Sequence, residues 1–217
     1  MNIVVGISGA TGVIFGIRIL EVLRRQPDVF THLVVSPSAS KTIVLETRFN
    51  EGQVIALADK VYPFRNIAAS ISSGSFPVDA MVVAPCSAKT LAGIATGYSD
   101  NLLVRAAEVT LKERRRLILM VRETPLHAVH LQNMLTVTQM GAIVMPPVPA
   151  FYHRPNTIEE IVDQTVNRAL DLLGIPLPKD LFERWDGGRS DPADREPLTS
   201  ANPSSRQGDN NGETASD

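Results

Sequence analysis

The sequence has little of several residue types, and each shortage excludes a class of protein. Its 217 residues contain one cysteine, Cys86, so an internal disulfide is excluded and a reducing compartment is favoured. Acidic and basic residues nearly balance, with a net charge of -2, which gives no reason to expect nucleic acid or an anionic membrane surface as a partner. No apolar run approaches the roughly 18 residues of a membrane span, and no basic leader precedes the first apolar stretch. We therefore expect a cytoplasmic protein without a membrane span.

Strand-like and helix-like patterns alternate along most of the chain. Such alternation predicts a parallel sheet covered by helices on both faces, in an α/β domain over residues 1–185. Pro85 is expected to end the clearest strand, and Thr157 with Glu160 is expected to form a capping box on the last helix. The predicted strands are 2–7, 29–35, 80–84, 117–121 and 142–145, with a short one within 59–65; the predicted helices are 13–25, 36–47, 87–96, 101–114, 127–140 and 157–173.

The composition changes at residue 186. From there to residue 217 the chain is made of Gly, Ser, Asp, Asn, Pro, Arg and similar residues, and Leu198 is the only large apolar residue. Such a segment cannot bury enough apolar surface to offset its ordering entropy, so we expect a disordered C-terminal tail.

A glycine-rich turn lies between the first predicted strand and the first helix. Backbone N–H groups at such a helix start suit a phosphate. The glycines at positions 6, 9 and 12 do not match the dinucleotide fingerprint, because Ser8 stands where its middle glycine is needed. The second strand ends at Ser36 rather than at an acidic residue, and no Gly-Lys-Ser/Thr follows the turn. A mononucleotide phosphate therefore fits better than NAD or ATP, and a tight turn without a ligand is the alternative.

Four predicted strands end in residues that suit a ligand. In open parallel sheets, ligands bind outside the carboxyl ends of the strands, so these ends should converge on one crevice. The first three ends are rich in small hydroxyl residues, and Arg122 adds a fixed positive charge at the fourth. Taken singly, Ser36 and Ser87 are equally well explained as N-caps of helices. The four ends are residues 8–12, Ser36, residues 85–87 and residues 122–123.

Other residues leave alternatives open. Cys86 is either a nucleophile at a helix start or a small buried residue, and no base is evident near it in sequence. His127 and His130 either share a metal or lie on a surface or an interface. Glu46 is either on the ligand side or simply exposed, and Trp185 docks against the core, a neighbouring subunit or a flat ligand.

Charged residues offer a second set of candidates. Arg105 and Lys112 lie seven residues apart, hence on one face of a predicted helix, where both could face one anion. Residues 114–116 are instead expected at a solvated helix end.

Taken in order, these segments resemble the UbiX-type flavin prenyltransferases. The likeness covers about residues 1–185 with few gaps, so it is far more specific than any one motif. One departure is Thr11, where many members of that family carry serine; the hydroxyl is kept, but the added methyl changes its reach. The matching segments are GISGATG at 6–12, APCSAKTL at 84–91, ATG at 95–97, DNL at 100–102, RAAEV at 105–109, LKERR at 111–115, RETP at 122–125, HLQNM at 130–134, GA at 141–142, PAFYH at 149–153 and LGI at 173–175.

The resemblance implies a fold, a reaction and a set of partners. The fold would be a single Rossmann- or flavodoxin-like doubly wound sheet, assembled into a homo-oligomer, usually a dodecamer. The reaction would join a dimethylallyl group from dimethylallyl phosphate to N5 and C6 of reduced FMN without a metal. The product, prenylated FMN, would pass to a UbiD-type decarboxylase.

The resemblance also implies roles for individual residues. Those matching the family's proton-handling and catalytic positions are Glu46, Glu123 and Thr11, with Trp185 as an aromatic near the prenyl group. Those matching FMN contacts are Gly9, Ala10, Thr11, Ser36, Ser87, Ala88, Lys89, Thr90 and Arg122. Those matching prenyl-phosphate contacts are Arg105, Lys112, Tyr152 and Arg168.

Two other functions remain to be distinguished. A flavin-dependent cysteine decarboxylase shares this fold and similar flavin loops, but it would not need the four prenyl-phosphate residues. A non-catalytic flavin carrier is the other alternative.

Overall fold

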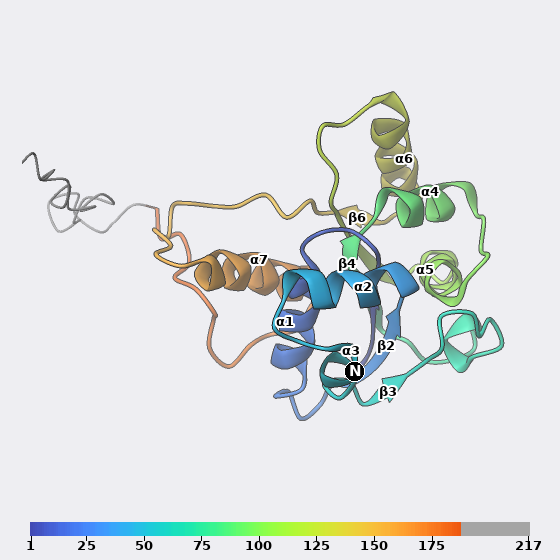
Figure 1. The fold of residues 1–217 in the computed structure, drawn as a ribbon, viewed down its shortest axis with the longest axis horizontal. Coiled ribbons are helices and arrows are strands. Elements are labelled where there is room, and N and C mark those ends of the chain that lie inside the picture. Colours follow the sequence, from blue (N-terminus) through green and yellow to red (C-terminus); the bar gives the residue numbers. More distant parts are fainter. Residues whose placement is uncertain (188–217) are drawn as a thin grey trace, which may run out of the picture. The chain divides into compact units, whose positions relative to one another are not determined.

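The carboxyl ends of six parallel strands define one edge of a sheet in the computed structural model, which describes residues 1–187 (Figure 1). The strand order is β3-β2-β1-β4-β5-β6, and every pairing is parallel. This is the Rossmann order, in which the chain reverses direction across the sheet between β1 and β4, and the prediction of a doubly wound α/β fold is confirmed. The strands are β1 Asn2–Ile7, β2 Phe30–Val35, β3 Lys60–Val61, β4 Ala80–Cys86, β5 Arg116–Val121 and β6 Ile143–Val144.

Helices cover both faces of this sheet. On one face, α1 and α7 pack against β1, β4 and β5, with α2 and α3 beside α1 (Figure 1). On the other face, α4 and α5 pack against the sheet, and α6 packs on α4. The helices are α1 Val13–Leu23, α2 Pro37–Glu46, α3 Glu51–Ile55, α4 Ala88–Thr96, α5 Leu102–Lys112, α6 Ala128–Gln139 and α7 Ile158–Leu173. None of these helices is long and apolar enough to span a membrane within the described part of the chain.

The chain divides into two units, Met1–Arg184 and Trp185–Asp217. The first unit contains every helix and strand named above. Of the second, the structure describes residues 185–187, so the predicted tail lies almost wholly outside the described residues.

The prediction that Pro85 ends its strand is wrong. β4 continues through Pro85 to Cys86, and its pairing with β5 shifts register between Val83 and Cys86. An irregular ladder tolerates a residue without an N–H, because that position need not donate a hydrogen bond. The carbonyl of Pro85 still accepts a hydrogen bond from Ser8 N at 3.2 Å.

Two helix starts differ from the sequence prediction. Thr157 caps α7 by accepting from Glu160 N, but the Glu160 carboxylate accepts from Asn156 N instead of closing a capping box. Helix α3 was not predicted, although Asn50 and Gln53 form a complete capping box at its start. Its five residues are too few to show a helical period.

Helix α6 is the least buried of the long helices. Val137 is its one buried residue, whereas Val129, Leu131 and Leu135 are each more than half exposed. Leu131 and Leu135 lie one turn apart and share a helix face that no described part of the chain covers, whereas Val129 is exposed on another side of the helix.

Close packing of α1 on β4 gives a first prediction. A Cβ at Gly16 would lie 2.2 Å from the Ala84 carbonyl oxygen, which is backbone and cannot rotate away. Gly16→Ala should therefore lower the free energy of unfolding by about 1–3 kcal/mol, as overpacked cores do. Chemical denaturation monitored by circular dichroism measures this loss.

Gly52→Ala is the matched control. Gly52 lies in the exposed helix α3, and the only neighbour within 4 Å of its added Cβ is Asn50 Oδ1 at 3.3 Å. Its stability should stay unchanged or rise slightly, because alanine is the better helix former. Equal losses in the two variants would contradict the packing argument.

Candidate functional site

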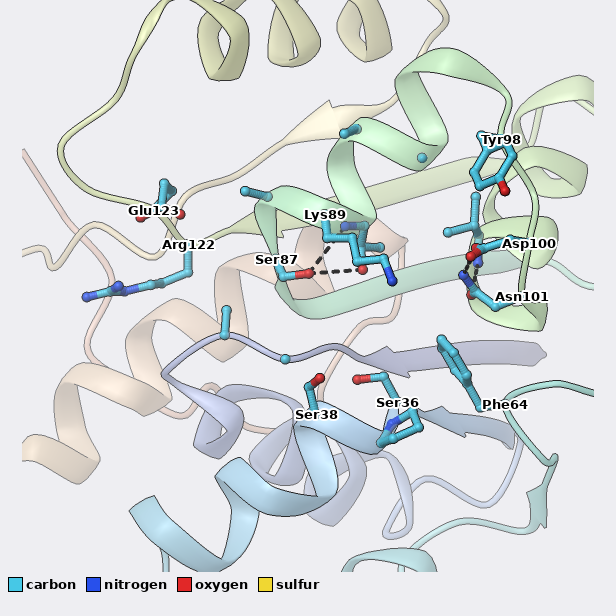
Figure 2. Close-up of a pocket in the computed structure, with 18 of the residues that line it drawn as sticks. Ser36, Ser38, Phe64, Ser87, Lys89, Tyr98, Asp100, Asn101, Arg122 and Glu123 are labelled. Carbon is cyan, nitrogen blue, oxygen red and sulfur yellow. Dashed lines mark hydrogen bonds between the residues drawn. The ribbon is translucent and has the colours of Figure 1, made fainter.

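A cavity of about 750 Å³ opens at the carboxyl edge of the sheet, beside the ends of β1 and β4, where the strand order reverses. Its volume is within the range of small-molecule sites. Figure 2 shows Arg122 and Glu123 at one end, Phe64, Tyr98, Asp100 and Asn101 at the other, and Ser36, Ser38, Ser87 and Lys89 between them. The residues predicted for the site that line it are Gly9, Ala10, Thr11, Ser36, Ser87, Ala88, Lys89, Thr90, Arg122 and Glu123.

Backbone hydrogen bonds extend past the strand ends and hold these segments side by side. Ser36 N donates to Ile7 O at 2.9 Å, linking the end of β2 to β1. Ser8 N donates to Pro85 O, and Arg122 N donates to Cys86 O at 3.0 Å. The expected convergence of four strand ends on one crevice is thereby confirmed.

Two helix starts face this cavity, and both are capped by serine. Ser36 Oγ accepts from Ala39 N at 3.1 Å, and Ser87 Oγ accepts from Thr90 N at 3.2 Å. Capping and cavity lining, which the sequence posed as alternatives, therefore coincide at both residues. In the first turn of α4, the N–H groups of Ala88 and Lys89 have no acceptor among the described residues. These donors suit an anion or a polar ring edge.

The glycine turn is fixed from two sides. Gly12 is the N-cap of α1 with a φ of 89°, and its N–H donates to Glu46 Oε2 at 2.8 Å. Glu46 thus binds the amino end of α1 from the end of α2 and is not among the residues lining the cavity. Gly9 is held by packing, because a Cβ there would lie 2.3 Å from Ser38 Cβ.

Several lining residues were not predicted. Ser38 follows the Ser36 cap, Phe64 comes from the segment after β3, and Tyr98, Asp100 and Asn101 lie between α4 and α5. Asn101 carried a usable signal, since its Oδ1 caps α5 by accepting from Val104 N at 3.0 Å. Phe64 and Tyr98 carried no such signal, because only the folded chain places them at one end of the cavity.

Arg105 and Lys112 share a helix face, as predicted, but that face meets residues 70–76 rather than the cavity. Arg105 Nε donates to Ser72 O at 3.3 Å, and its Nη1 pairs with Glu108 at 3.2 Å. Lys112 pairs with Glu113, next to Gly74. The Glu113 carboxylate has its pKa lowered chiefly by the hydrogen bond from Lys112.

Arg168 and Tyr152 also lie outside the cavity lining. Arg168 Nη1 pairs with Asp171 Oδ2 at 2.6 Å, and Arg184 binds the same carboxylate at 2.9 Å. The pKa of Asp171 is lowered, first by the hydrogen bond from Arg184 and then by the one from Arg168. Tyr152 is 44% exposed and accepts a 3.4 Å hydrogen bond from Gln164. Trp185 is exposed and begins the second unit.

Cys86 is completely buried in β4, and burial raises the pKa of its thiol far above the ordinary value. Such a thiol stays protonated and inert, which favours the small buried residue over the nucleophile. The rings of His127 and His130 stack at 3.6 Å, and His127 Nδ1 accepts from Val129 N at the start of α6. No cluster of three or more metal-ligating side chains occurs between residues 1 and 187.

Known proteins that are similar to this chain bind or modify a flavin, which is a ligand that this cavity can hold. A family model described as flavoprotein matches residues 1–170. Flavin prenyltransferase UbiX of Salmonella typhimurium is 57% identical over 186 residues, which cover 86% of this chain and 98% of that protein. AnUbiX, solved in complex with FMN and dimethylallyl pyrophosphate, is 52% identical with a TM-score of 0.82, covering 86% of this chain and 97% of that one. A dodecameric FMN-dependent UbiX-like decarboxylase from Escherichia coli O157:H7 is 50% identical with a TM-score of 0.83, covering 86% and 100%.

A Rossmann-ordered sheet with a cavity at its switch point, together with the family match over residues 1–170, makes this chain a flavoprotein. Identity of 57% over nearly the whole of a curated UbiX protein also identifies the family within the flavoproteins. The chain belongs to the UbiX-type flavin prenyltransferases. FMN-dependent cysteine decarboxylases, represented by TvaF at 16% identity, share the fold alone.

Burial of the sole cysteine gives a second prediction. Because Cys86 is 0% exposed and its thiol has a raised pKa, the folded protein should react with a thiol-specific disulfide reagent at least about 100-fold more slowly than the unfolded chain at pH 8. Absorbance of the released thiolate measures both rates, and the denatured protein serves as the control. Fast labelling of the folded protein would identify an accessible thiolate and contradict the burial.

Proposed function

We propose that this chain joins a dimethylallyl group from dimethylallyl phosphate to N5 and C6 of reduced FMN, producing prenylated FMN. One observation carries the proposal: the cavity combines the amino ends of two helices, several small hydroxyl residues and two arginines, Arg65 and Arg122. The similarity to flavin prenyltransferase UbiX and to AnUbiX, solved with FMN and dimethylallyl pyrophosphate, supports the same reaction. FMN fits the donor set, because the N–H groups of Ala88 and Lys89 still need acceptors.

The residues lining the cavity are proposed to hold FMN. Gly9, Ala10 and Thr11 form one wall, and the start of α4 forms the facing wall. Arg122 lies at one end with a permanent positive charge, which suits an electron-rich ring edge or an anion. When bound, reduced FMN supplies the nucleophilic ring atoms of the transfer.

Departure of an allylic phosphate leaves negative charge on that phosphate and a delocalised cation on the prenyl group. Fixed cations lower such a barrier, and Arg105, Lys112 and Arg168 are proposed to supply them, with Tyr152 as a further contact. Glu123, half-buried in the cavity, is proposed to take the proton released on ring closure, with Glu46 and Thr11 assisting. Trp185 is proposed to face the prenyl cation.

None of the four prenyl-phosphate residues lines the cavity of a single chain, so the proposed site needs more than one subunit. The uncovered apolar side chains of α6, with Leu131 and Leu135 on one side of the helix and Val129 on another, support self-assembly. The E. coli relative is dodecameric, and we propose the same assembly here. We further propose a cytoplasmic enzyme whose product passes to a UbiD-type decarboxylase.

The direct test is to incubate the protein with reduced FMN and either dimethylallyl phosphate or the diphosphate, and then to weigh the flavin by mass spectrometry. A mass increase of one dimethylallyl group with either donor supports the proposal. Unchanged flavin mass with tight FMN binding would favour the non-catalytic carrier. In a parallel incubation with oxidised FMN and a cysteine-ended peptide, loss of carbon dioxide from the peptide with reduction of the flavin would favour the decarboxylase.

Gly9 gives a third prediction. Gly9→Ala should force the glycine turn away from Ser38 and weaken FMN binding about 10-fold or more, because site geometry tolerates displacements of only about 0.5 Å. Titration of FMN fluorescence measures the dissociation constant. Adding Ser38→Gly removes the clashing Cβ, so the double variant should bind FMN more tightly than Gly9→Ala alone. If the second substitution restores nothing, the clash with Ser38 is not the cause.

The charged residues give a fourth prediction. Lys112→Ala and Arg168→Ala should bind FMN normally but transfer the prenyl group about 100- to 1,000-fold more slowly, as for loss of one charge-stabilising donor. Glu123→Gln should keep the cations and slow product formation. Single-turnover absorbance with reduced FMN measures all three rates.

Arg24→Ala is the control for loss of positive charge. Arg24 lies at the end of α1 and donates to Ala56 O, away from the cavity and from residues 70–76. Its transfer rate should equal the parental one. Parental rates in all three test variants would refute the residue roles without refuting the family.

A further inference from the structure

Ser8 is buried behind the cavity wall, with 1% of its surface exposed, and is absent from the cavity lining. Its hydroxyl makes two hydrogen bonds to β4 and the residue that follows it. Ser8 Oγ donates to Pro85 O at 2.8 Å and accepts from Ser87 N at 2.7 Å. Ser8 N also donates to Pro85 O, so two contacts join this residue to the end of β4 and one joins it to Ser87, the N-cap of α4.

The polarity of these bonds is fixed. The single hydroxyl hydrogen points to the Pro85 carbonyl, which can only accept, so an oxygen lone pair is left for the Ser87 N–H. Pro85 keeps a second donor, Ser8 N, whereas Ser87 N has no other acceptor among the described residues. The Ser87 backbone therefore depends on this hydroxyl.

Ser87 in turn determines where α4 begins. Its Oγ accepts from Thr90 N and donates to Thr90 Oγ1 at 3.1 Å, which closes the first turn of the helix (Figure 2). The next two N–H groups, of Ala88 and Lys89, are the ones left for a ligand. A shift of Ser87 moves these donors relative to the glycine turn on the opposite wall.

We propose that Ser8 is a positioning residue for flavin binding: its hydroxyl fixes the distance between the glycine turn and the amino end of α4. The inference rests on the proposed function only in taking FMN as the ligand. Ser8 acts through Ser87 and has no contact with the ligand itself.

The experiment is to replace Ser8 with Ala and to titrate the variant with FMN, following flavin fluorescence. Ser8→Ala removes the acceptor of the part-buried Ser87 N–H, and leaving such a donor without a partner costs free energy. The dissociation constant should rise about 10- to 100-fold, the range expected when one such donor loses its partner. In turnover, the KM for FMN should rise by a similar factor, while kcat at saturating FMN changes less than about threefold.

Thr31→Val is a matched control at the opposite end of the sheet. Thr31 is 0% exposed at the amino end of β2, and its hydroxyl also makes one donated and one accepted bond, to Asp59 Oδ2 at 2.8 Å and from Asp59 N at 3.0 Å. Both Thr31→Val and Ser8→Ala should lose thermal stability, but Thr31→Val should keep the parental affinity for FMN.

The outcomes separate the two hypotheses. If the parental protein fails to bind FMN, the proposed function fails. If it binds FMN and Ser8→Ala binds equally well, or loses no more affinity than Thr31→Val, the role of Ser8 is refuted. Should Ser8→Ala not fold, Ser8→Cys retains a weak acceptor and should show an intermediate affinity, and parental affinity in that variant would overturn the proposal.

Discussion

The site depends on backbone hydrogen bonding that continues beyond the carboxyl ends of the central strands. A parallel sheet normally splays at this edge, because each chain leaves for a helix on one face or the other. Here Ser36, Ser8 and Arg122 each donate an N–H back to the neighbouring strand after the regular pairing has ended. The segments carrying the glycine turn, two helix starts and the arginine are therefore parts of one rigid ladder. The cavity is preformed, and its walls are as firmly placed as the sheet.

Much of this architecture could be predicted from local sequence patterns. Apolar runs bounded by glycine, proline and serine locate the four long strands, and serine caps locate α2 and α4. Since parallel strands end at a common edge, the convergence of the four strand-end segments on one cavity could be predicted from the strand positions. Pro85 misled the prediction, because a proline within a strand is tolerated only where the ladder is irregular, and such an irregularity has no sequence signal.

The contacts of Arg105 and Lys112 could not be predicted from the sequence. Helical periodicity correctly put Arg105 and Lys112 on one face, but it contains no information on which segment that face meets. Family resemblance points to a prenyl-phosphate role for them, whereas in one chain they contact residues 70–76 and nearby acidic side chains. Both statements are compatible if neighbouring subunits complete the site, a relation that no single-chain pattern encodes. Tyr98 and Phe64 were not predicted for a related reason, because only the folded chain determines which residues line a cavity.

The position of Glu46 affects which ligands can bind at the amino end of α1. In dinucleotide-binding proteins, the pyrophosphate lies at the amino end of the first helix. Here that end is occupied by a carboxylate, since Gly12 N donates to Glu46 Oε2 at 2.8 Å. Two unit charges 4 Å apart near a protein surface repel by about 4 kcal/mol, so an added phosphate at this position would be strongly disfavoured. Charge repulsion at α1 would thus disfavour NAD and FAD, and the helix starts that face the cavity without a carboxylate bound to their N–H groups are those of α2 and α4.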